Sequence, residues 1–360
     1  MKKPTISGII VPTLLLAALA VILNSPVASA TSEGAIAGKV TKEESIFDRI
    51  WGLTTLYQND ENSGLQEISF IGRYHGQYYW VDGDTGKDDG WENRRLWFGL
   101  KSRFARHFSI KAQVELDTDA DPIYAGLTDA YIAWNRTDEF RFTVGKIWVK
   151  FTQEGATSSI EILTFERSML VNQVWPAPEF ITGVMADGKI GGGHFLYRVG
   201  AFAGDKQKEL TEFDAGFGYL GSIGYDFGKD IGFNGGVVRA DWFHNDGDPD
   251  NDAFRDYENV VSLNLELKQG AFGLTADLIF AKGLDNISDV WGFVILPSYD
   301  ITKNIQVAAR YHHANADGAN GLTAAKRYEQ SAGGGTGDNY NAGYLGLNYY
   351  TIFTVTNSSS

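Results

Sequence analysis

The sequence has no cysteine, a shortage of basic residues and, after its first thirty positions, no long apolar run. Without cysteine a disulfide framework is excluded, so regular secondary structure must stabilise this 360-residue chain. A membrane-spanning helix needs about 20 apolar residues, and no segment after residue 30 supplies them. The remaining way to cross a membrane is a closed β-barrel, whose signal is an alternation of side chains rather than an apolar run.

The charge balance and the missing motifs exclude further classes of protein. The first thirty residues hold two lysines and no acid, so the rest of the chain has 29 basic residues against 45 acidic ones, a net charge of −16. This charge argues against nucleic acid as a partner. The six histidines form no His-Glu-x-x-His pattern, and the sequence has no Gly-x-Ser-x-Gly motif and no phosphate-cradling loop. We therefore predict a protein without a cofactor or a metal site that is not an enzyme.

The N-terminus has the pattern of a secretory signal peptide at residues 1–30. A basic start, Met1–Lys3, precedes an apolar run, Val11–Leu23, and the segment ends in the small residues of Pro26–Ala30. Residues 31–64 are expected to form a periplasmic N-terminal segment with a short helix, because Ile46, Ile50 and Leu53 recur at helical spacing. Residues 65–360 are expected to form the main domain.

The clearest pattern of the main domain is the stretch Trp91–Asp117, which predicts a β-hairpin. Before the turn Ala105–His107, Leu96, Phe98 and Leu100 share one parity, and the opposite parity includes Arg95, Lys101 and Arg103. After the turn, apolar side chains from Phe108 to Leu116 alternate with polar ones. Successive side chains of a strand point to opposite faces, so the hairpin has one apolar face and one charged face.

The same alternation predicts about fourteen strands of a length suited to crossing a membrane. Beyond the hairpin and a strand around Ile68–Trp80, the expected strands are Thr128–Asn135, Glu139–Val149, Ile181–Lys189, His194–Ala203, Ala215–Gly228, Gly232–Phe243, Tyr257–Lys268, Ala271–Ala281, Asp289–Tyr299, Ile305–His312 and Asn339–Tyr350.

The connections between these strands alternate in length, which distinguishes a membrane barrel from a soluble fold. The predicted long set is Asp82–Gly90, Thr118–Leu127, Lys150–Phe180, Gly204–Asp214, His244–Asp256, Lys282–Ser288 and His313–Asp338. The connections between them are short. Long outer loops and short periplasmic turns are typical of outer-membrane barrels. We therefore predict an all-β fold, a transmembrane antiparallel β-barrel in the outer membrane of a Gram-negative-type bacterium, with outer-membrane lipid around it.

In such a barrel the face shared with Leu96 contacts lipid and the other face lines the lumen. Eleven bases and eight acids have the parity of the lumen, which leaves a positive excess inside a negatively charged protein. A positive wall raises the local concentration of anions and lowers their barrier. The expected bases are Arg73, Arg95, Lys101, Arg103, Lys111, Arg141, Lys189, Arg198, Arg239, Lys268 and Arg310, and the acids are Glu115, Asp117, Asp129, Asp187, Asp226, Asp241, Glu266 and Asp277.

Several short stretches in order resemble the phosphate-selective porin O/P family. They are Arg94-Arg95-Leu96 before Gly99, Thr128–Tyr131, Phe142–Lys146, Ala156–Ser159 and Phe165–Arg167, with similarity from about Ile68 to Asn348. The resemblance implies a sixteen-stranded homotrimeric barrel with arginines along the pore. It also implies an anion-binding constriction where the third outer loop, Lys150–Phe180, folds inward.

The resemblance carries roles to some residues of this chain. Arg94 and Arg95 match the family's paired arginines, Asp129 matches its lumen acid, and Arg167 matches the arginine of its Glu-Arg pair. Strict alternation points only Arg95 inward, so Arg94 requires a β-bulge or a place at the rim. Arginine suits the role because its planar fork binds oxyanions bidentately and stays charged. The expected pore or anion-binding residues are Arg94, Arg95, Asp129, Arg167, Lys101, Lys111, Arg141, Lys146, Arg198 and Arg310.

Two departures from the family pattern bear on function and completeness. Gly155 and Ile160 stand where phosphate-binding members carry loop lysines, so anion preference is a firmer expectation than phosphate selectivity. The family pattern continues with two more strands after Tyr350, whereas this sequence ends in Thr351–Ser360. We expect either a truncated chain or a fourteen-stranded barrel.

The function expected from the sequence is passive diffusion of small anions, such as phosphate or other oxyanions, through an arginine-lined pore. One alternative is a non-selective general porin with a balanced lumen. Another is a soluble exported β-sandwich that binds carbohydrate or polyphosphate, which would use the high aromatic content without a membrane.

Overall fold

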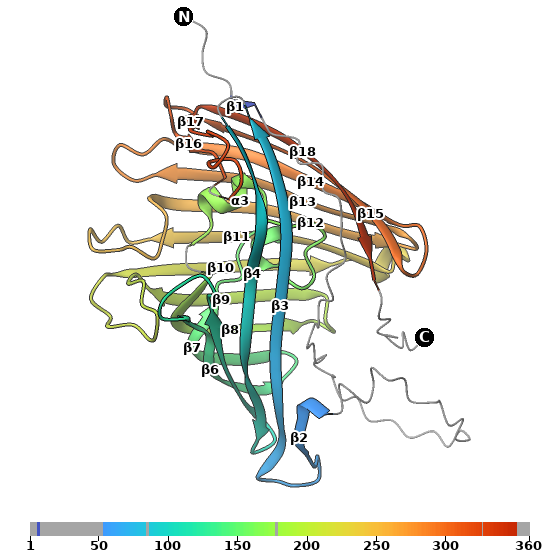
Figure 1. Cartoon of the computed structure of the whole chain (residues 1–360). Coiled ribbons are helices and arrows are strands. Elements are labelled where there is room, and N and C mark those ends of the chain that lie inside the picture. The colour runs from blue at the N-terminus through green and yellow to red at the C-terminus, as the bar shows by residue number, and fades with distance from the viewer. Residues whose placement is uncertain (1–5, 8–52, 84–85, 177–178, 326, 351–360) are drawn as a thin grey trace, which may run out of the picture.

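The structure is a computed structural model that describes residues 6–7, 53–83, 86–176, 179–325 and 327–350 (Figure 1). Neighbouring strands pair antiparallel along one long sheet, with a two-residue strand β1 (Ile6–Ser7) parallel to its last member. The sheet contains β2 (Thr55–Gln58), β3 (Leu65–Gly83), β4 (Gly86–Phe104), β5 (Phe108–Leu116), β6 (Tyr124–Thr137), β7 (Phe140–Trp148), β8 (Phe180–Ile190), β9 (Phe195–Ala203), β10 (Phe217–Asp226), β11 (Gly235–Asn245), β12 (Tyr257–Gln269), β13 (Phe272–Gly283), β14 (Val290–Asp300), β15 (Ile305–Ala316) and β18 (Asn339–Tyr349).

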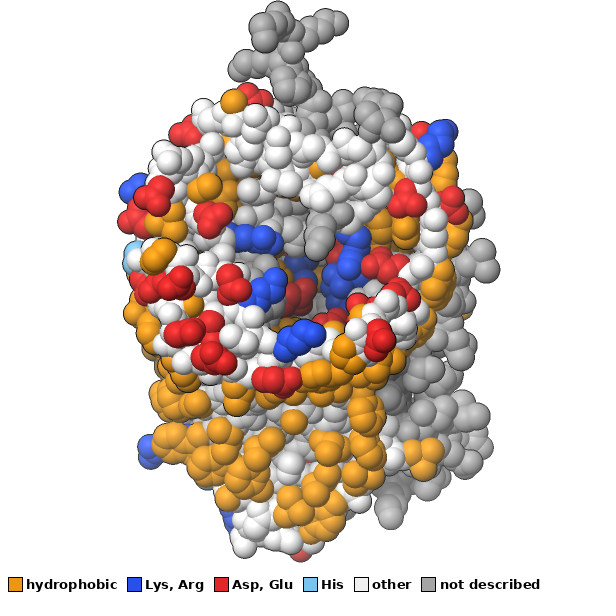
Figure 2. Space-filling view, turned by 60° about the vertical axis from the view of Figure 1, so that its left-hand side comes forward, with side chains coloured by type: hydrophobic (Ala, Val, Ile, Leu, Met, Phe, Trp, Pro, Cys, Tyr) orange, Lys and Arg blue, Asp and Glu red, His pale blue; other side chains and the backbone are white. Residues whose placement is uncertain are grey.

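The fourteen predicted strands are confirmed: they are β3 to β15 and β18. The sheet curves around a hollow interior (Figures 1 and 2). Because one continuous sheet forms this wall, the β-sandwich alternative is wrong. Among the described residues, no pairing joins β3 to β18, so a seam between them separates the first and last long strands.

The predicted alternation of faces is visible in the burial of each strand. On β12, Val261 and Leu263 are exposed, whereas Ser262 and Asn264 between them are buried. The same rule exposes Phe98 on β4 and Val144 on β7 on the outer wall. Figure 2 shows apolar side chains gathered in broad patches on the outer wall, below a rim that carries many acidic side chains. A contiguous apolar outer wall is what lipid chains require of a barrel.

The first long outer loop was predicted wrongly, because Asp82–Gly90 continues the hairpin of β3 and β4. The two strands pair up to Gly83 and Gly86. Its acidic residues have cross-strand partners: the ammonium of Lys87 lies 2.6 Å from the carboxylate of Asp82, and the Tyr79 hydroxyl donates to Asp88. Such pairs stabilise a strand that composition alone describes as a loop.

The N-terminal predictions mostly concern residues that the structure does not describe. Most of the signal peptide, and Ile46 and Ile50 of the expected helix, lie outside the described residues, as do residues 351–360. The residues between Gln58 and Leu65 form the turn between β2 and β3, so β2 adds part of the predicted N-terminal segment, residues 31–64, to the sheet. Among the described residues, no helix is long and apolar enough to span a membrane.

An apolar core lies inside the wrapped sheet, where only a polar lumen was expected. The connection between β7 and β8 contains α2 (Gln153–Ala156) and α3 (Met169–Val174). Leu170 and Val171 of α3 are fully buried and belong to one cluster with Ile279 of β13 and Val294 of β14. This connection, the predicted third outer loop, is therefore packed against one side of the interior. The remaining elements are η1 (Lys229–Ile231) and a small separate sheet of β16 (Leu322–Thr323) and β17 (Thr336–Gly337).

Candidate functional site

The connection between β7 and β8, residues 149–179, is held to the inner wall by buried polar contacts on several strands. The Asp277 carboxylate on β13 accepts hydrogen bonds from the backbone N–H groups of Gln153, at 2.8 and 3.0 Å, and Glu154, at 3.2 Å. On β11, the Arg239 guanidinium donates to the Thr152 carbonyl at 3.1 Å. Because the first N–H groups of a helix have no partner within it, Asp277 satisfies donors that α2 itself leaves open.

Within this loop, Glu154 and Arg167 join its two short helices. Glu154 accepts from the backbone N–H of Ser168, the residue that caps α3, at 2.8 Å, and it pairs with Arg310 of β15 at 2.8 Å. Burial alone would raise the pKa of Glu154, but the charge of Arg310 and the bonds from Ser168 outweigh it, so its pKa lies below the usual value. Glu154 is thus a buried carboxylate anion with both partners supplied by the protein.

Arg167, predicted to bind anions, is fully occupied by the loop. Its Nε donates to the Glu154 carbonyl and its Nη2 to the Thr157 carbonyl, while its Nη1 lies 2.9 Å from the Glu179 carboxylate. The guanidinium also stacks over the Trp175 ring, at 4.6 Å from its centre. These contacts make Arg167 a structural residue that stabilises the conformation of the loop.

The paired arginines of β4 both face the interior, because the strand carries a bulge. The register of β3 and β4 shifts between His75 and Gly76, which pair with Arg95 and Asn93 and leave Arg94 as the extra residue. Arg94 forms a bidentate ion pair with Glu166 of the loop, which holds the pKa of Glu166 low despite its burial. Arg95 is 2% exposed, and its Nη2 has no hydrogen-bond partner.

The other bases predicted to line the pore form two groups, those that pair with a carboxylate and those that do not. Lys111 pairs with Asp129 at 2.6 Å and Lys101 pairs with Glu67 at 2.9 Å, so both bases are compensated on the inner wall. Arg141 and Arg198 have no carboxylate partner among the described residues.

Lys146 does not share the location of these residues, which corrects its prediction. It lies on the face of β7 that also bears the exposed side chains of Phe142 and Val144. Its ammonium donates to the carbonyls of Gln207 and Lys208, at 2.7 and 2.8 Å, in the loop after β9. That loop covers Lys146 from outside, so the residue is buried without facing the interior.

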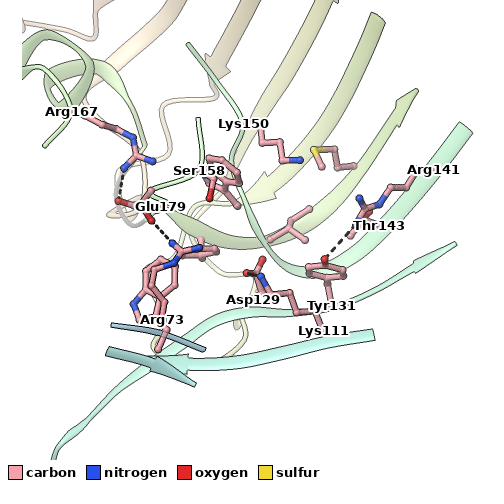
Figure 3. A pocket seen from close by; sticks show the side chains of 16 residues that line it. Arg73, Lys111, Asp129, Tyr131, Arg141, Thr143, Lys150, Ser158, Arg167 and Glu179 are labelled. Carbon is pink, nitrogen blue, oxygen red and sulfur yellow. Dashed lines mark hydrogen bonds and ion pairs between the residues drawn. The ribbon is translucent and has the colours of Figure 1, made fainter. Parts of the chain in front are cut away.

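A cavity of ≈ 200 Å³ lies between the loop and the inner faces of β3 to β8. Figure 3 shows that basic side chains reach it from several elements, with Arg73 on one side and Arg141 and Lys150 on another. Its lining is Arg73, Trp97, Lys111, Asp129, Tyr131, Arg141, Thr143, Ile147, Trp148, Lys150, Ser158, Ser159, Arg167, Glu179, Phe180 and Met185.

Sequence reasoning missed Lys150 as a functional candidate, although it named this residue as the first of the loop. Alternation along β7 would turn an even-numbered side chain outward, but the strand ends at Trp148 and the chain turns inward. Burial, and then the positive charge of Arg198, lower the pKa of Lys150 to about 8. Arg73 was identified as a lumen base, but nothing in the sequence indicated its contacts with Ser159 and the Trp97 ring.

Among the described residues, no group of histidines and acids could hold a metal ion. The cavity lining instead carries five basic side chains against two acidic ones, Asp129 and Glu179.

Comparison with known proteins finds a family model that matches part of this chain. The family model for phosphate-selective porin O and P matches residues 70–223. No curated protein sequence matches this chain.

Solved structures share the fold at low sequence identity. Salmonella typhi OmpF, in a complex with daunomycin, aligns with a TM-score of 0.56 at 10% identity and covers 83% of this chain and 88% of its own. OmpT of Vibrio cholerae aligns with a TM-score of 0.52 at 13% identity, and the alignment covers 82% of this chain and 85% of OmpT. The outer-membrane channel DcaP of Acinetobacter baumannii aligns with a TM-score of 0.52 at 13% identity, and the alignment covers 83% of this chain and 90% of DcaP. The chain therefore has the fold of an outer-membrane porin, its residues 70–223 match the family model for phosphate-selective porin O and P, and these findings support a location in the outer membrane of a Gram-negative bacterium.

Proposed function

We propose that this porin is a passive channel that favours small anions, without enzymatic activity. The observation that carries the proposal is a set of bases with no carboxylate within ion-pair distance among the described residues. They lie on β3, β4, β7 and β9 and at the start of the third loop, and they comprise Arg73, Arg95, Arg141, Lys150 and Arg198. Uncompensated charge of one sign on a confined wall lowers the barrier for counter-ions.

The acids of the same region are largely engaged, which supports a positive potential there. Glu154, Glu166 and Glu179 pair with arginines. Asp277 is surrounded by backbone N–H donors of the loop, and Glu266 accepts from the side chain of Gln153. These contacts support the proposal that the third loop narrows the passage and that free bases along the remaining wall set its selectivity. The homotrimer implied by the family resemblance stays a prediction.

The competing function is a general porin with little charge preference. It is favoured by acids that share the inner wall without a basic partner, including Asp187 and Glu115. In that case the free bases and these acids would cancel along the path of the ion.

Reversal potentials across planar bilayers in a potassium chloride gradient separate the two functions. We expect anion preference, and we expect Arg95→Gln to lower the anion-to-cation permeability ratio about two- to fivefold, the effect of one charge several ångströms from the ion in water. Arg136→Gln is the matched control, because that exposed arginine lies at the end of β6, next to the short turn before β7. Cation preference, or equal effects of the two substitutions, would contradict the proposal.

A further inference from the structure

The walls of β7, β8 and β9 carry a second group of polar side chains, separate from the arginines that hold the loop. Arg141 and Thr143 are two residues apart on the inner face of β7, and Trp148 ends that strand. Across the sheet, Arg141 lies opposite Asp187, and Asp187 lies opposite Arg198. Lys150 follows β7 and approaches the same wall (Figure 3).

Several hydrogen-bond donors in this group lack an acceptor, and one carboxylate oxygen of Asp187 is likewise buried without a donor. The Thr143 hydroxyl is without a partner although the residue is only 1% exposed. The indole N–H of Trp148 and the Nε groups of Arg141 and Arg198 are also buried and unpartnered. The ammonium of Lys150 contacts the Trp148 ring, 5.5 Å from its centre. Buried donors left unsatisfied are costly, so several together indicate a position that a ligand completes.

The same cavity also has apolar walls, which restrict the kind of ligand. Trp97, Ile147 and Met185 line it and are almost completely buried, and Phe180 packs edge-on against Trp97 at 5.5 Å between ring centres. A small inorganic anion would leave these surfaces without contact, whereas an anion with an apolar body covers them.

We propose that Thr143, Trp148, Lys150 and Arg141 form a binding position for organic carboxylates, with the carboxylate on these donors and its apolar part against Trp97, Ile147 and Met185. The inference rests on the proposed anion channel and names a solute class for it. Arg94 and Arg167 play no direct part, because their guanidinium groups are occupied by Glu166, Glu179 and loop carbonyls. Arg198 is a positioning residue, since its Nη1 donates to the Lys150 carbonyl at 2.7 Å.

The test is inhibition of the chloride current through the full-length porin in planar bilayers by benzoate, acetate and inorganic phosphate. We expect benzoate to inhibit at a concentration at least about tenfold lower than acetate, because only benzoate buries an apolar ring. Lys150→Met should raise the half-inhibitory concentration of benzoate roughly tenfold, and the near-isosteric Thr143→Val about fivefold.

The matched control is Lys189→Met, which removes a lysine from the inner parity of β8 at the end away from this cavity. Chloride conductance without benzoate reports whether each variant folds and opens. Equal benzoate inhibition in Lys150→Met and Lys189→Met, or phosphate inhibition at lower concentrations than benzoate, would overturn the carboxylate position while leaving anion preference intact. A cation-preferring wild-type channel would instead refute the proposed function.

Discussion

At the scale of single residues, the bases of the inner face divide into structural and free groups. Arg94, Arg167 and Arg310 have the charge and geometry expected of anion ligands, yet each already pairs with a carboxylate of the chain. Lys150 is the opposite case, since it is buried beside other cations and has no acid partner. Residue type alone therefore does not identify the solute-binding bases, because the deciding factor is whether the fold already supplies the counter-charge.

The lowered pKa of Lys150, about 8, predicts a pH dependence for benzoate inhibition. The groups around its ammonium are Arg198 on β9, Asp187 on β8, Arg141 on β7 and Asp129 on β6. Below this pKa Lys150 is charged and binds benzoate, and above it the charge is lost, so inhibition should weaken as the pH rises through about 8. The carboxyl group of benzoate, with a pKa of about 4, stays ionised throughout.

The measurement is the half-inhibitory concentration of benzoate between about pH 6 and about pH 10. We expect a rise of roughly tenfold in the wild type and a much flatter curve in Lys150→Met. The same pH dependence in both proteins would assign the titration to another group.

At the scale of elements, the strands could be predicted from the sequence and the position of the third loop could not. Strand faces follow from a period of two against a lipid and an aqueous side, as on β12, and this signal is local. The bulge at Arg94 was also foreseen as one of two options, since two adjacent arginines cannot both point inward from a regular strand.

The contacts of the loop depend instead on residues far apart in the chain. Asp277 binds the backbone of Gln153 across 124 positions, and Arg310 binds Glu154 across 156. No periodicity encodes such pairings. For the same reason, the sequence indicated an inward loop only through family resemblance, and it gave no sign of the apolar core around α3.

Removing the anchor of this loop should change the channel. Asp277→Ala deletes the acceptor of three hydrogen bonds from the N-terminus of α2 and should weaken docking of the loop by roughly 3 kcal/mol. We expect a higher single-channel conductance with more current noise, and faster cleavage of the loop in limited proteolysis. Asp226→Ala is the control, because this inner acid contacts Gly228 near a short turn. Indistinguishable traces from the two variants would show that Asp277 does not hold the loop.

At the scale of the whole molecule, loop contacts connect the two sides of the seam between β3 and β18. Glu166 of the third loop pairs with Arg94 of β4, while the neighbouring Leu163 carbonyl accepts from Asn348 of β18 at 3.2 Å. The last loop adds a second connection, since Arg327 lies 2.8 Å from the Glu92 carboxylate on β4. Polar loops thus link strands whose backbones do not pair among the described residues.

This arrangement predicts a localised effect of Glu166→Gln. The substitution keeps the shape of the side chain but removes the charge that compensates Arg94, and the Glu166 side chain is only 21% exposed, so the loss should be roughly 2–3 kcal/mol. Because Glu166 connects the loop to β4, the opening should concentrate at the seam. Hydrogen exchange should therefore accelerate in β3, β4 and β18 while β9 to β13 keep their protection.

The matched control is Glu179→Gln, whose carboxylate is similarly exposed, at 27%, and pairs with Arg167 within the loop region. Loss of the ion pair between Glu179 and Arg167 should accelerate hydrogen exchange around the loop and β8, and leave the exchange rates of β18 unchanged. The two variants together separate a general loss of buried ion pairs from a contact that joins the first strands to the last. If hydrogen exchange in Glu166→Gln accelerated equally over all strands, the third loop would not connect the two sides of the seam. Loss of a contact that joins β4 to β18 should accelerate exchange only in the strands next to the seam.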